Sequence, residues 1–245
     1  MKLTILQNEH ELSVFAANLV IEHINNNPKD LLVFPTGNTP LGMFEHLVSN
    51  YEAGKVSFKE SRLLELDEYS GISLTDDRSL FAWLDRSLIN KVNFLTENVY
   101  RFNSDNTEVE IEIQRIENII HKNNGLDLLI LGLGPNGHLG FNEPGSSVDS
   151  STRLVKLTPE SIQSNARYWS DYSVVPEYGF TLGMKSILSA KKVILLVQGS
   201  SKADILYKTI NANISDDIPA THLRTLNNCI ILSDQEAARK INTFS

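Results

Sequence analysis

Short apolar runs alternate with longer segments of helical periodicity along almost the whole chain. Five runs are predicted as strands, at residues 31–36, 62–69, 126–134, 192–199 and 229–234. Three of them are nearly continuous Leu, Ile and Val, which is typical of parallel strands covered on both faces. Amphipathic helices are predicted at 11–26, 80–92, 108–123 and 202–213. This order indicates one α/β domain over residues 1–245, with an open, doubly wound, mostly parallel sheet flanked by helices.

The net charge of the chain indicates which kinds of partner it is not expected to bind. With 22 basic and 30 acidic residues, the chain has a formal charge of −8, which disfavours nucleic acid and anionic membranes as partners. No stretch resembles a signal peptide or a spanning helix. The single cysteine, Cys229, lies in an apolar run and is predicted to be a buried strand residue. We therefore expect a cytoplasmic protein that acts on a small molecule.

Residues 145–176 differ from the rest of the chain. They lack long apolar runs and are rich in Ser, Asn and Tyr. This segment is predicted to be a lid-like insertion, either a short helical excursion or a mobile cover over a site.

The glycines of "GLGPNG", residues 132–137, have the G-x-G-x-x-G spacing of a dinucleotide-binding loop. Such a loop needs a helix that starts within the motif and receives the pyrophosphate. Here Pro135, Gly140 and Pro144 oppose a helix, because glycine and proline are the two poorest helix formers. The acidic residue expected about 20 positions later is also missing from "RLVKLT", residues 153–158. The NAD interpretation is therefore rejected, and no cofactor is expected.

Polar side chains follow four of the predicted strands. "TGNTP" follows the first, Asp67 the second, a loop with His138 and Glu143 the third, and "SSK" with Lys202 the fourth. Ligands of doubly wound sheets bind at the carboxyl ends of the strands, where the strand order reverses. The sequence therefore predicts one site that gathers these four strand ends.

Acid/base chemistry is suggested by three of these residues. His138 and Glu143 could pair, because a carboxylate beside an imidazole fixes its tautomer and supports its charged form. Asp67 could act as a carboxylate base across the crevice. The structural alternatives are that His138 caps the strand, Glu143 is solvated and Asp67 caps a turn.

Two strand ends suit an anion. In "TGNTP" the Thr hydroxyls, the backbone N–H groups and the start of a helix could face a phosphate, with Thr39 as helix cap and Pro40 as first helical residue. Lys202 stands at a helix start, where its charge opposes the helix dipole, so it is expected to serve a ligand. No His or Cys spacing indicates a metal site, and none is predicted.

Five motifs in this order, "FPTGNTPLG", "LDEYSG", "GLGPNGHLGFNEPGSS", "NARYW" and "GSSKA", resemble the glucosamine-6-phosphate deaminase (isomerase) family. The resemblance covers nearly the whole chain. It implies a Rossmann-like sheet and the cofactor-free conversion of glucosamine 6-phosphate and water to fructose 6-phosphate and ammonium.

The resemblance also implies residue roles. His138 would protonate the ring oxygen during ring opening, Glu143 would tune His138, and Asp67 would carry a proton between C2 and C1. The phosphate and substrate contacts would come from Thr36, Gly37, Asn38, Thr39, Gly137, Arg167 and Lys202. Some members have Asp where this chain has Asn136, so Asn136 is expected to orient its neighbours by hydrogen bonds rather than relay a proton.

Allosteric members of the family have a longer C-terminal tail and a basic effector contact at the position of Val155. A monomer or small homo-oligomer without that regulation is therefore expected. The alternatives are a galactosamine-6-phosphate deaminase, a 6-phosphogluconolactonase and a non-enzymatic sugar-phosphate sensor. Acid/base residues and the lack of a helix-turn-helix pattern argue against a sensor.

Overall fold

The central element is a parallel sheet of seven strands. The computed structural model describes residues 1–105, 107–166 and 175–241. The strands lie in the order β1-β10-β9-β6-β2-β3-β5, and every neighbouring pair is parallel. Their bounds are β1 Lys2–Leu6, β2 Leu31–Phe34, β3 Arg62–Glu65, β5 Val99–Tyr100, β6 Leu128–Gly132, β9 Val193–Val197 and β10 Cys229–Asp234. The predicted mostly parallel α/β sheet is thus confirmed.

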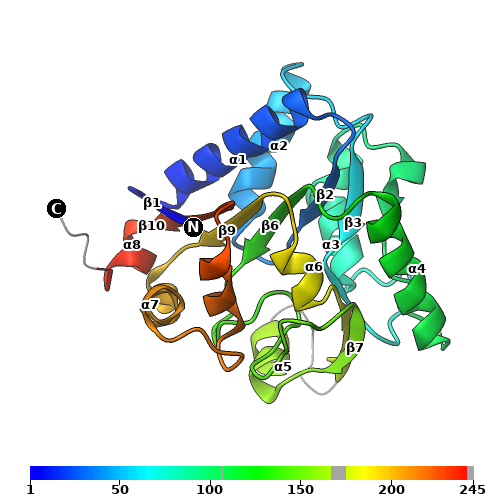
Figure 1. The fold of residues 1–245 in the computed structure, drawn as a ribbon. Helices are drawn as coiled ribbons and strands as arrows, with labels where there is room; N and C mark the ends of the chain where they lie inside the picture. The colour runs from blue at the N-terminus through cyan, green and yellow to red at the C-terminus, as the bar shows by residue number, and fades with distance from the viewer. Residues whose placement is uncertain (106, 167–174, 242–245) are drawn as a thin grey trace.

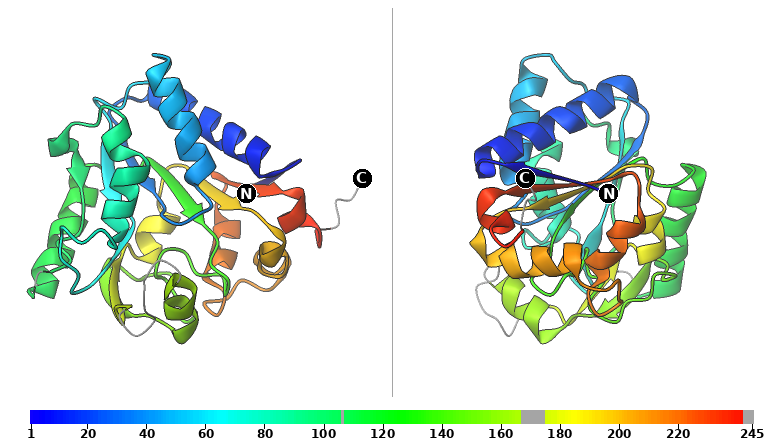
Figure 2. Two further views of the ribbon diagram at one scale, coloured as in Figure 1. Left: turned by 180° about the vertical axis from the view of Figure 1, so that it is seen from behind. Right: turned by 60° about the vertical axis from the view of Figure 1, so that its left-hand side comes forward.

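Helices cover both faces of this sheet (Figures 1 and 2). One face carries α1 Glu9–Asn26, α2 Leu41–Glu52 and α3 Leu80–Ser87. The other carries α4 Val109–Lys122, α6 Met184–Leu188, α7 Ala203–Asn211 and α8 Gln235–Ala238. None of the helices in the described ranges is long and apolar enough to cross a bilayer.

Strand side chains alternate between two apolar cores, as the pleat requires. In β2, Leu32 and Phe34 pack with α1 and α2, whereas Leu31 and Val33 pack in the core under α4 and α6. All four side chains are at most 1% exposed. The uninterrupted apolar run is therefore explained by burial on both faces.

The strand order reverses between β2 and β6. From β2 the chain builds outward through β3 and β5, and it then returns to the other side of β2 with β6, β9 and β10. The loops that leave the carboxyl ends of β2 and β6 therefore diverge, and a crevice opens between them.

A small antiparallel sheet lies beyond this edge, and it corrects the prediction of one strand over 62–69. The run divides at Leu66 into β3 and β4 Asp67–Tyr69, and β4 pairs with β8 Tyr178–Thr181 rather than with the main sheet. The division has a local cause. Glu65 is the last β3 residue paired with β2, opposite Phe34, and the residue that follows β2 is Pro35, which has no N–H for the ladder.

The predicted insertion at 145–176 contains β7 Arg153–Lys156, which pairs with β8, and α5 Pro159–Asn165. A third apolar cluster, which includes Tyr69, Phe141 and Leu157, lies at this sheet. In Figure 1, α5 and β7 lie together at the end of the molecule away from α1 and α2. Residues 167–174 lie outside the described residues, and lid motion stays a prediction.

Candidate active site

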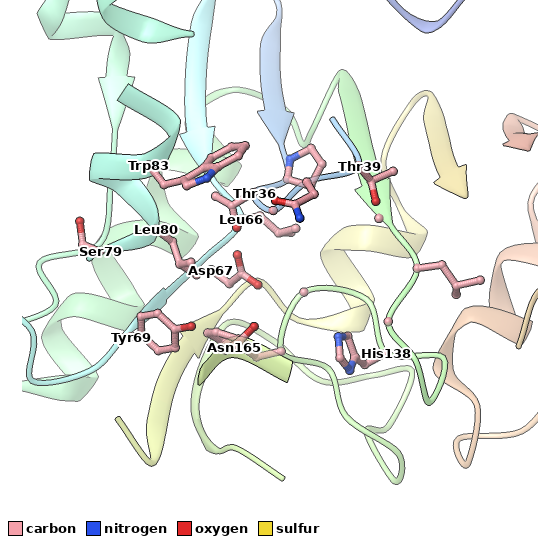
Figure 3. A pocket seen from close by; sticks show the side chains of 18 of the residues that line it. Thr36, Thr39, Leu66, Asp67, Tyr69, Ser79, Leu80, Trp83, His138 and Asn165 are labelled. Carbon is pink, nitrogen blue, oxygen red and sulfur yellow. The ribbon is translucent and has the colours of Figure 1, made fainter. Parts of the chain in front are cut away.

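A pocket of about 270 Å³ opens where the carboxyl ends of β2, β3, β6 and β9 meet. This is the reversal point of the strand order. Figure 3 shows its walls: Asp67 lies between Trp83 and Tyr69, and His138 enters from the loop after β6. The residues around the pocket include Thr36, Gly37, Asn38, Thr39, Leu66, Asp67, Tyr69, Leu80, Trp83, Gly134, His138, Phe141, Asn165 and Lys202.

The loop between β2 and α2 forms one wall. Gly37 has φ of 90°, a value that favours glycine, and it lets the chain turn sharply after Pro35. The expected cap is shifted by one position: Pro40, not Thr39, is the residue before the first turn of α2, and Pro40 makes no side-chain cap. Thr39 is therefore not the N-cap residue of α2, and it lines the pocket.

Asp67 is a nearly buried carboxyl that lines the pocket. Its side chain comes from β4, and the residue is 7% exposed. Burial, and then the charge of Glu68, raise the pKa of Asp67 to about 7. A carboxyl with such a pKa can both take and return a proton near neutral pH.

His138, Glu143 and Asn136 form a hydrogen-bonded group in the loop after β6. Nδ1 of His138 lies 3.3 Å from Oε2 of Glu143, and Nδ2 of Asn136 donates to the same oxygen at 3.0 Å. Oδ1 of Asn136 accepts from the backbone N–H of His138 at 3.2 Å. Glu143 therefore lies behind the imidazole, and Asn136 connects the two residues.

Glu143 remains charged in this group. Burial raises its pKa, but the hydrogen bond and charge of His138, with hydrogen bonds from Ser161 and Asn136, outweigh burial and lower the pKa to about 2. A carboxylate at Nδ1 favours the proton on that nitrogen. Nε2 is then the nitrogen of His138 left for a ligand.

No helix occurs between Gly132 and β7, so the loop lacks the element that a dinucleotide site requires. Its glycines have steric roles instead. Gly137 has φ of 89°, and a Cβ there would lie 2.5 Å from the Ile218 side chain. Its N–H donates to Gly134 and its carbonyl accepts from Ala220. The structure therefore does not bring Gly137 to the pocket wall, although a ligand contact was predicted for it.

Gly134→Ala should displace the His138 ring. A Cβ at Gly134 would lie 2.2 Å from Cδ2 and 2.3 Å from Nε2 of His138, well inside contact distance. We expect turnover to fall about 10²-fold or more, since small misplacement of a reacting group has costs of this order. In a His138→Ala background the same change should cost little more, because the displaced ring is already gone. A full additional loss in that background would contradict the steric explanation.

Lys202 lies at the junction of the short helix Ser200–Lys202 with α7 and lines the pocket. Its Nζ donates to the carbonyl of Leu133 at 2.6 Å. The ammonium group is therefore held across the crevice, against the loop after β6. That this charge serves a ligand stays a prediction.

Sequence reasoning missed the wall formed by α3. Leu80, Trp83 and Arg86 recur at three-residue intervals and line the pocket, as does Tyr69. The helical periodicity of this segment was visible, but nothing in it distinguished a face against a core from a face against a pocket. Arg86 pairs with exposed Asp77 at 3.7 Å.

The predicted residues are partly assembled by the structure. Seven line one pocket: Thr36, Gly37, Asn38, Thr39, Asp67, His138 and Lys202. Glu143 and Asn136 support His138 from behind. Arg167 lies outside the described residues. Within the described part of the chain, no group of three or more His, Cys, Asp or Glu side chains could hold a metal ion.

Comparison with known proteins identifies relatives over the whole chain. The family model described as glucosamine-6-phosphate isomerases/6-phosphogluconolactonase matches residues 7–231. A glucosamine-6-phosphate deaminase of Clostridium botulinum is 38% identical, with 99% of both chains covered. One of Halalkalibacterium halodurans is 36% identical, with 100% of both covered.

Solved structures give the same picture. A structure described as a monomeric glucosamine-6-phosphate deaminase has a TM-score of 0.95 and 34% identity, covering 98% of this chain and 100% of that chain. A 6-phosphogluconolactonase from Leishmania guyanensis has a TM-score of 0.75 at 18% identity, with 98% of both chains covered. The second likeness is one of fold alone.

Proposed function

Because the chain belongs to the family of glucosamine-6-phosphate isomerases and 6-phosphogluconolactonases, we propose that it converts glucosamine 6-phosphate and water to fructose 6-phosphate and ammonium. One observation carries this proposal. A carboxyl with a pKa of about 7, Asp67, and a carboxylate-backed imidazole, His138, line the same pocket. The pocket thus offers two proton carriers, which an aldose–ketose conversion requires.

The first step is opening of the pyranose ring. His138 gives a proton to the ring oxygen as the C1–O5 bond breaks. The C1 hydroxyl gives its proton to water to form the aldehyde, and the imidazole is protonated again from solvent. Glu143 stabilises the charged imidazole before this transfer. Because Glu143 lies at Nδ1, the proton given to the ring oxygen is the one on Nε2.

The second step moves a proton from C2 to C1. Ionised Asp67 removes the C2 proton, the electron pair forms the C1–C2 double bond, and the former aldehyde oxygen takes a proton from solvent, which gives an enolamine with hydroxyl at C1 and amine at C2. Asp67, now protonated, returns the proton to C1 and leaves an iminium at C2. Water adds to that iminium, ammonium leaves, and the ketone of fructose 6-phosphate remains. Asp67 ends the cycle ionised, so no cofactor is consumed.

The phosphate is assigned to the loop 36–39 and Lys202, with Arg167 added by the family resemblance. Threonine hydroxyls, backbone N–H groups at a helix start and an ammonium group are typical phosphate ligands. Lys202 and this loop line the pocket from the ends of β9 and β2, which lie on either side of β6.

Lys202→Ala should raise KM mainly. Removing an ammonium that holds the phosphate equally in substrate and transition state weakens binding without changing the chemical step. We expect KM to rise about tenfold or more, as loss of a charge-assisted contact implies. Lys208→Ala is the matched control, because Lys208 is an exposed lysine of the same helix. Loss of kcat at unchanged KM would count against phosphate binding by Lys202.

Ammonium release tests the function directly. Glucosamine 6-phosphate and galactosamine 6-phosphate are assayed in parallel, with 6-phosphogluconolactone hydrolysis as a third arm. Ammonium release with the glucosamine substrate at the highest kcat/KM supports the proposal. A preference for galactosamine 6-phosphate would show that the protein selects the other configuration at C4 of the sugar. Lactone hydrolysis without ammonium release would show that it is a 6-phosphogluconolactonase.

We further propose a cytoplasmic protein that acts as a monomer or small homo-oligomer. The likeness to a deaminase described as monomeric supports this, and light scattering during size-exclusion chromatography tests it. Val155 packs half-buried beside the apolar cluster of Tyr69 and Phe141. This apolar placement supports the expectation that the protein lacks the allosteric regulation of members that have a basic effector contact at this position.

A further inference from the structure

Two carboxyl groups lie directly behind the pocket wall and have no part in the steps above. Glu65, at the end of β3, is 2% exposed, and Glu68, in β4, is 1% exposed. They flank Asp67 in the sequence, yet neither lines the pocket. Burial of two acids so close together needs a physical explanation, because an unpaired buried charge is costly.

Glu68 is satisfied by backbone N–H groups. Its Oε1 accepts from Tyr69 at 2.7 Å and from Leu80 at 2.9 Å, and its Oε2 accepts from Phe81 at 3.0 Å. Leu80 and Phe81 begin α3, where the helix dipole favours a negative charge. Burial raises the pKa of Glu68, and these three N–H donors oppose that shift by stabilising the charged form. Glu68 thus ties the strand of Asp67 to α3, the pocket wall that the sequence did not predict.

Glu65 has only one ordinary donor. Its Oε2 accepts from the N–H of Phe102 at 2.8 Å. Its Oε1 is buried and has no hydrogen-bond donor among the described residues. Yet the Glu65 and Glu68 side chains are in hydrogen-bond contact with each other. Two carboxylates cannot form such a bond, because both are acceptors, so one of them must carry a proton.

We propose that Glu65 is a protonated carboxylic acid that donates a hydrogen bond to Glu68, and that this acid–carboxylate pair positions α3 against Asp67. Glu65 and Glu68 are thus positioning residues, and Asp67 is the catalytic one. The bond itself is a property of the fold. Its effect on turnover rests on the function proposed above.

The surroundings agree with a proton on Glu65. Burial, and then the charge of Glu68, raise the pKa of Glu65 well above its usual range; Asp67 adds to this, and only the Phe102 N–H opposes it. Arg101, which precedes the Phe102 donor, lies with its guanidinium over the Phe81 ring and donates to the carbonyl of Leu74.

The pair also limits the negative charge beside the catalytic acid. Glu68 alone already raises the pKa of Asp67, after burial. A second full charge on Glu65 would raise it further and leave less of the base ionised at neutral pH. A neutral Glu65 holds Glu68 in place without that penalty.

The pH profile of the Glu65→Gln variant distinguishes a protonated Glu65 from an ionised one. Glutamine copies the protonated acid, since its oxygen can accept from Phe102 and its NH₂ can donate to Glu68. We expect unchanged kcat/KM and an unchanged acid limb of the pH profile, which in the wild type should lie near the pKa of Asp67. If Glu65 is ionised instead, removing its charge shifts that limb to lower pH, and the proposal is overturned. Glu68→Gln, which removes the real charge, should shift the limb downward.

Two measurements do not depend on the reaction. At pH 9, where Asp67 is ionised, the wild type should show the infrared band of a protonated carboxyl group and Glu65→Gln should lack it. Unfolding should also differ. Because the folded pKa of Glu65 is raised, wild type loses stability relative to Glu65→Gln as pH rises above the unfolded value of 4.5, by up to about tenfold in the folding constant per pH unit. If the infrared band is missing, or if the stability difference between wild type and Glu65→Gln does not change with pH, Glu65 is not protonated. That conclusion holds whether or not the protein releases ammonium.

Glu65→Leu tests the positioning role. It keeps the volume roughly but removes the donor to Glu68, so kcat/KM should fall about 10- to 100-fold, the factor that a hydrogen bond to a charged group implies. Glu65→Gln should restore it. Equal activity of the leucine and glutamine variants, both folded by circular dichroism, would overturn the positioning role and leave the proposed reaction untouched.

Discussion

Asp67→Asn is expected to lower kcat by about 10²- to 10⁴-fold, the range by which a positioned proton carrier accelerates a reaction. Asparagine has nearly the same shape but cannot accept the C2 proton. No neighbour replaces it, because the carboxylate of Glu68 is directed to the start of α3 and is occupied by three N–H donors. The loss should appear in ammonium release with KM little changed.

The fold should survive this change and become more stable at neutral pH. Burial raises the pKa of Asp67 to about 7 from 3.8, so its contribution to stability is complete below pH 3.8 and is lost as pH rises through 7. Asparagine removes that loss, so the melting temperature above pH 7 should rise. Wild-type ammonium release by Asp67→Asn would remove Asp67 from the mechanism. A lower melting temperature would contradict the burial effect.

The centre of the fold was predictable, whereas its periphery was not. The runs of β2, β6, β9 and β10 are buried on both faces, and such strands have continuous apolar sequences. The two edge strands of the sheet lack such a continuous apolar run, because β5 has only two residues and β1 is only half-buried. The division of 62–69 depended on the partner strand, where Pro35 follows Phe34, the last β2 residue paired with β3. A strand's own sequence does not contain that information.

The site was predictable where it depends on topology alone. Carboxyl ends of parallel strands meet at one edge, so Thr36, Asp67, His138 and Lys202 lie at one pocket although up to 166 positions separate them in the chain. The α3 wall was not predictable, because its position is set by Glu68 capping the helix from another strand. Glu68 lies in β4 beside Asp67, so its hydrogen bond to Leu80 also holds the strand of the predicted Asp67 against α3, the wall that the sequence did not predict.

His138→Ala should also lower kcat about 10²- to 10⁴-fold, but through a different step. Without the imidazole, the pyranose ring has no proton donor on its oxygen, and turnover becomes limited by slow opening of the ring. Proton transfer by Asp67 is then no longer rate-limiting. Glucosamine 6-phosphate deuterated at C2 distinguishes the two cases, because only the Asp67 step breaks the C2–H bond.

The isotope effect on kcat should therefore separate the two variants. In His138→Ala it should fall toward one, because breaking C2–D no longer limits the rate. In the residual activity of Asp67→Asn it should stay large, because C2–H cleavage is the step that was slowed. Glu143→Gln, which keeps the shape but removes the charge behind Nδ1, should resemble a weaker His138→Ala. A large isotope effect in His138→Ala would mean that His138 assists proton transfer at carbon, and that ring opening proceeds without it.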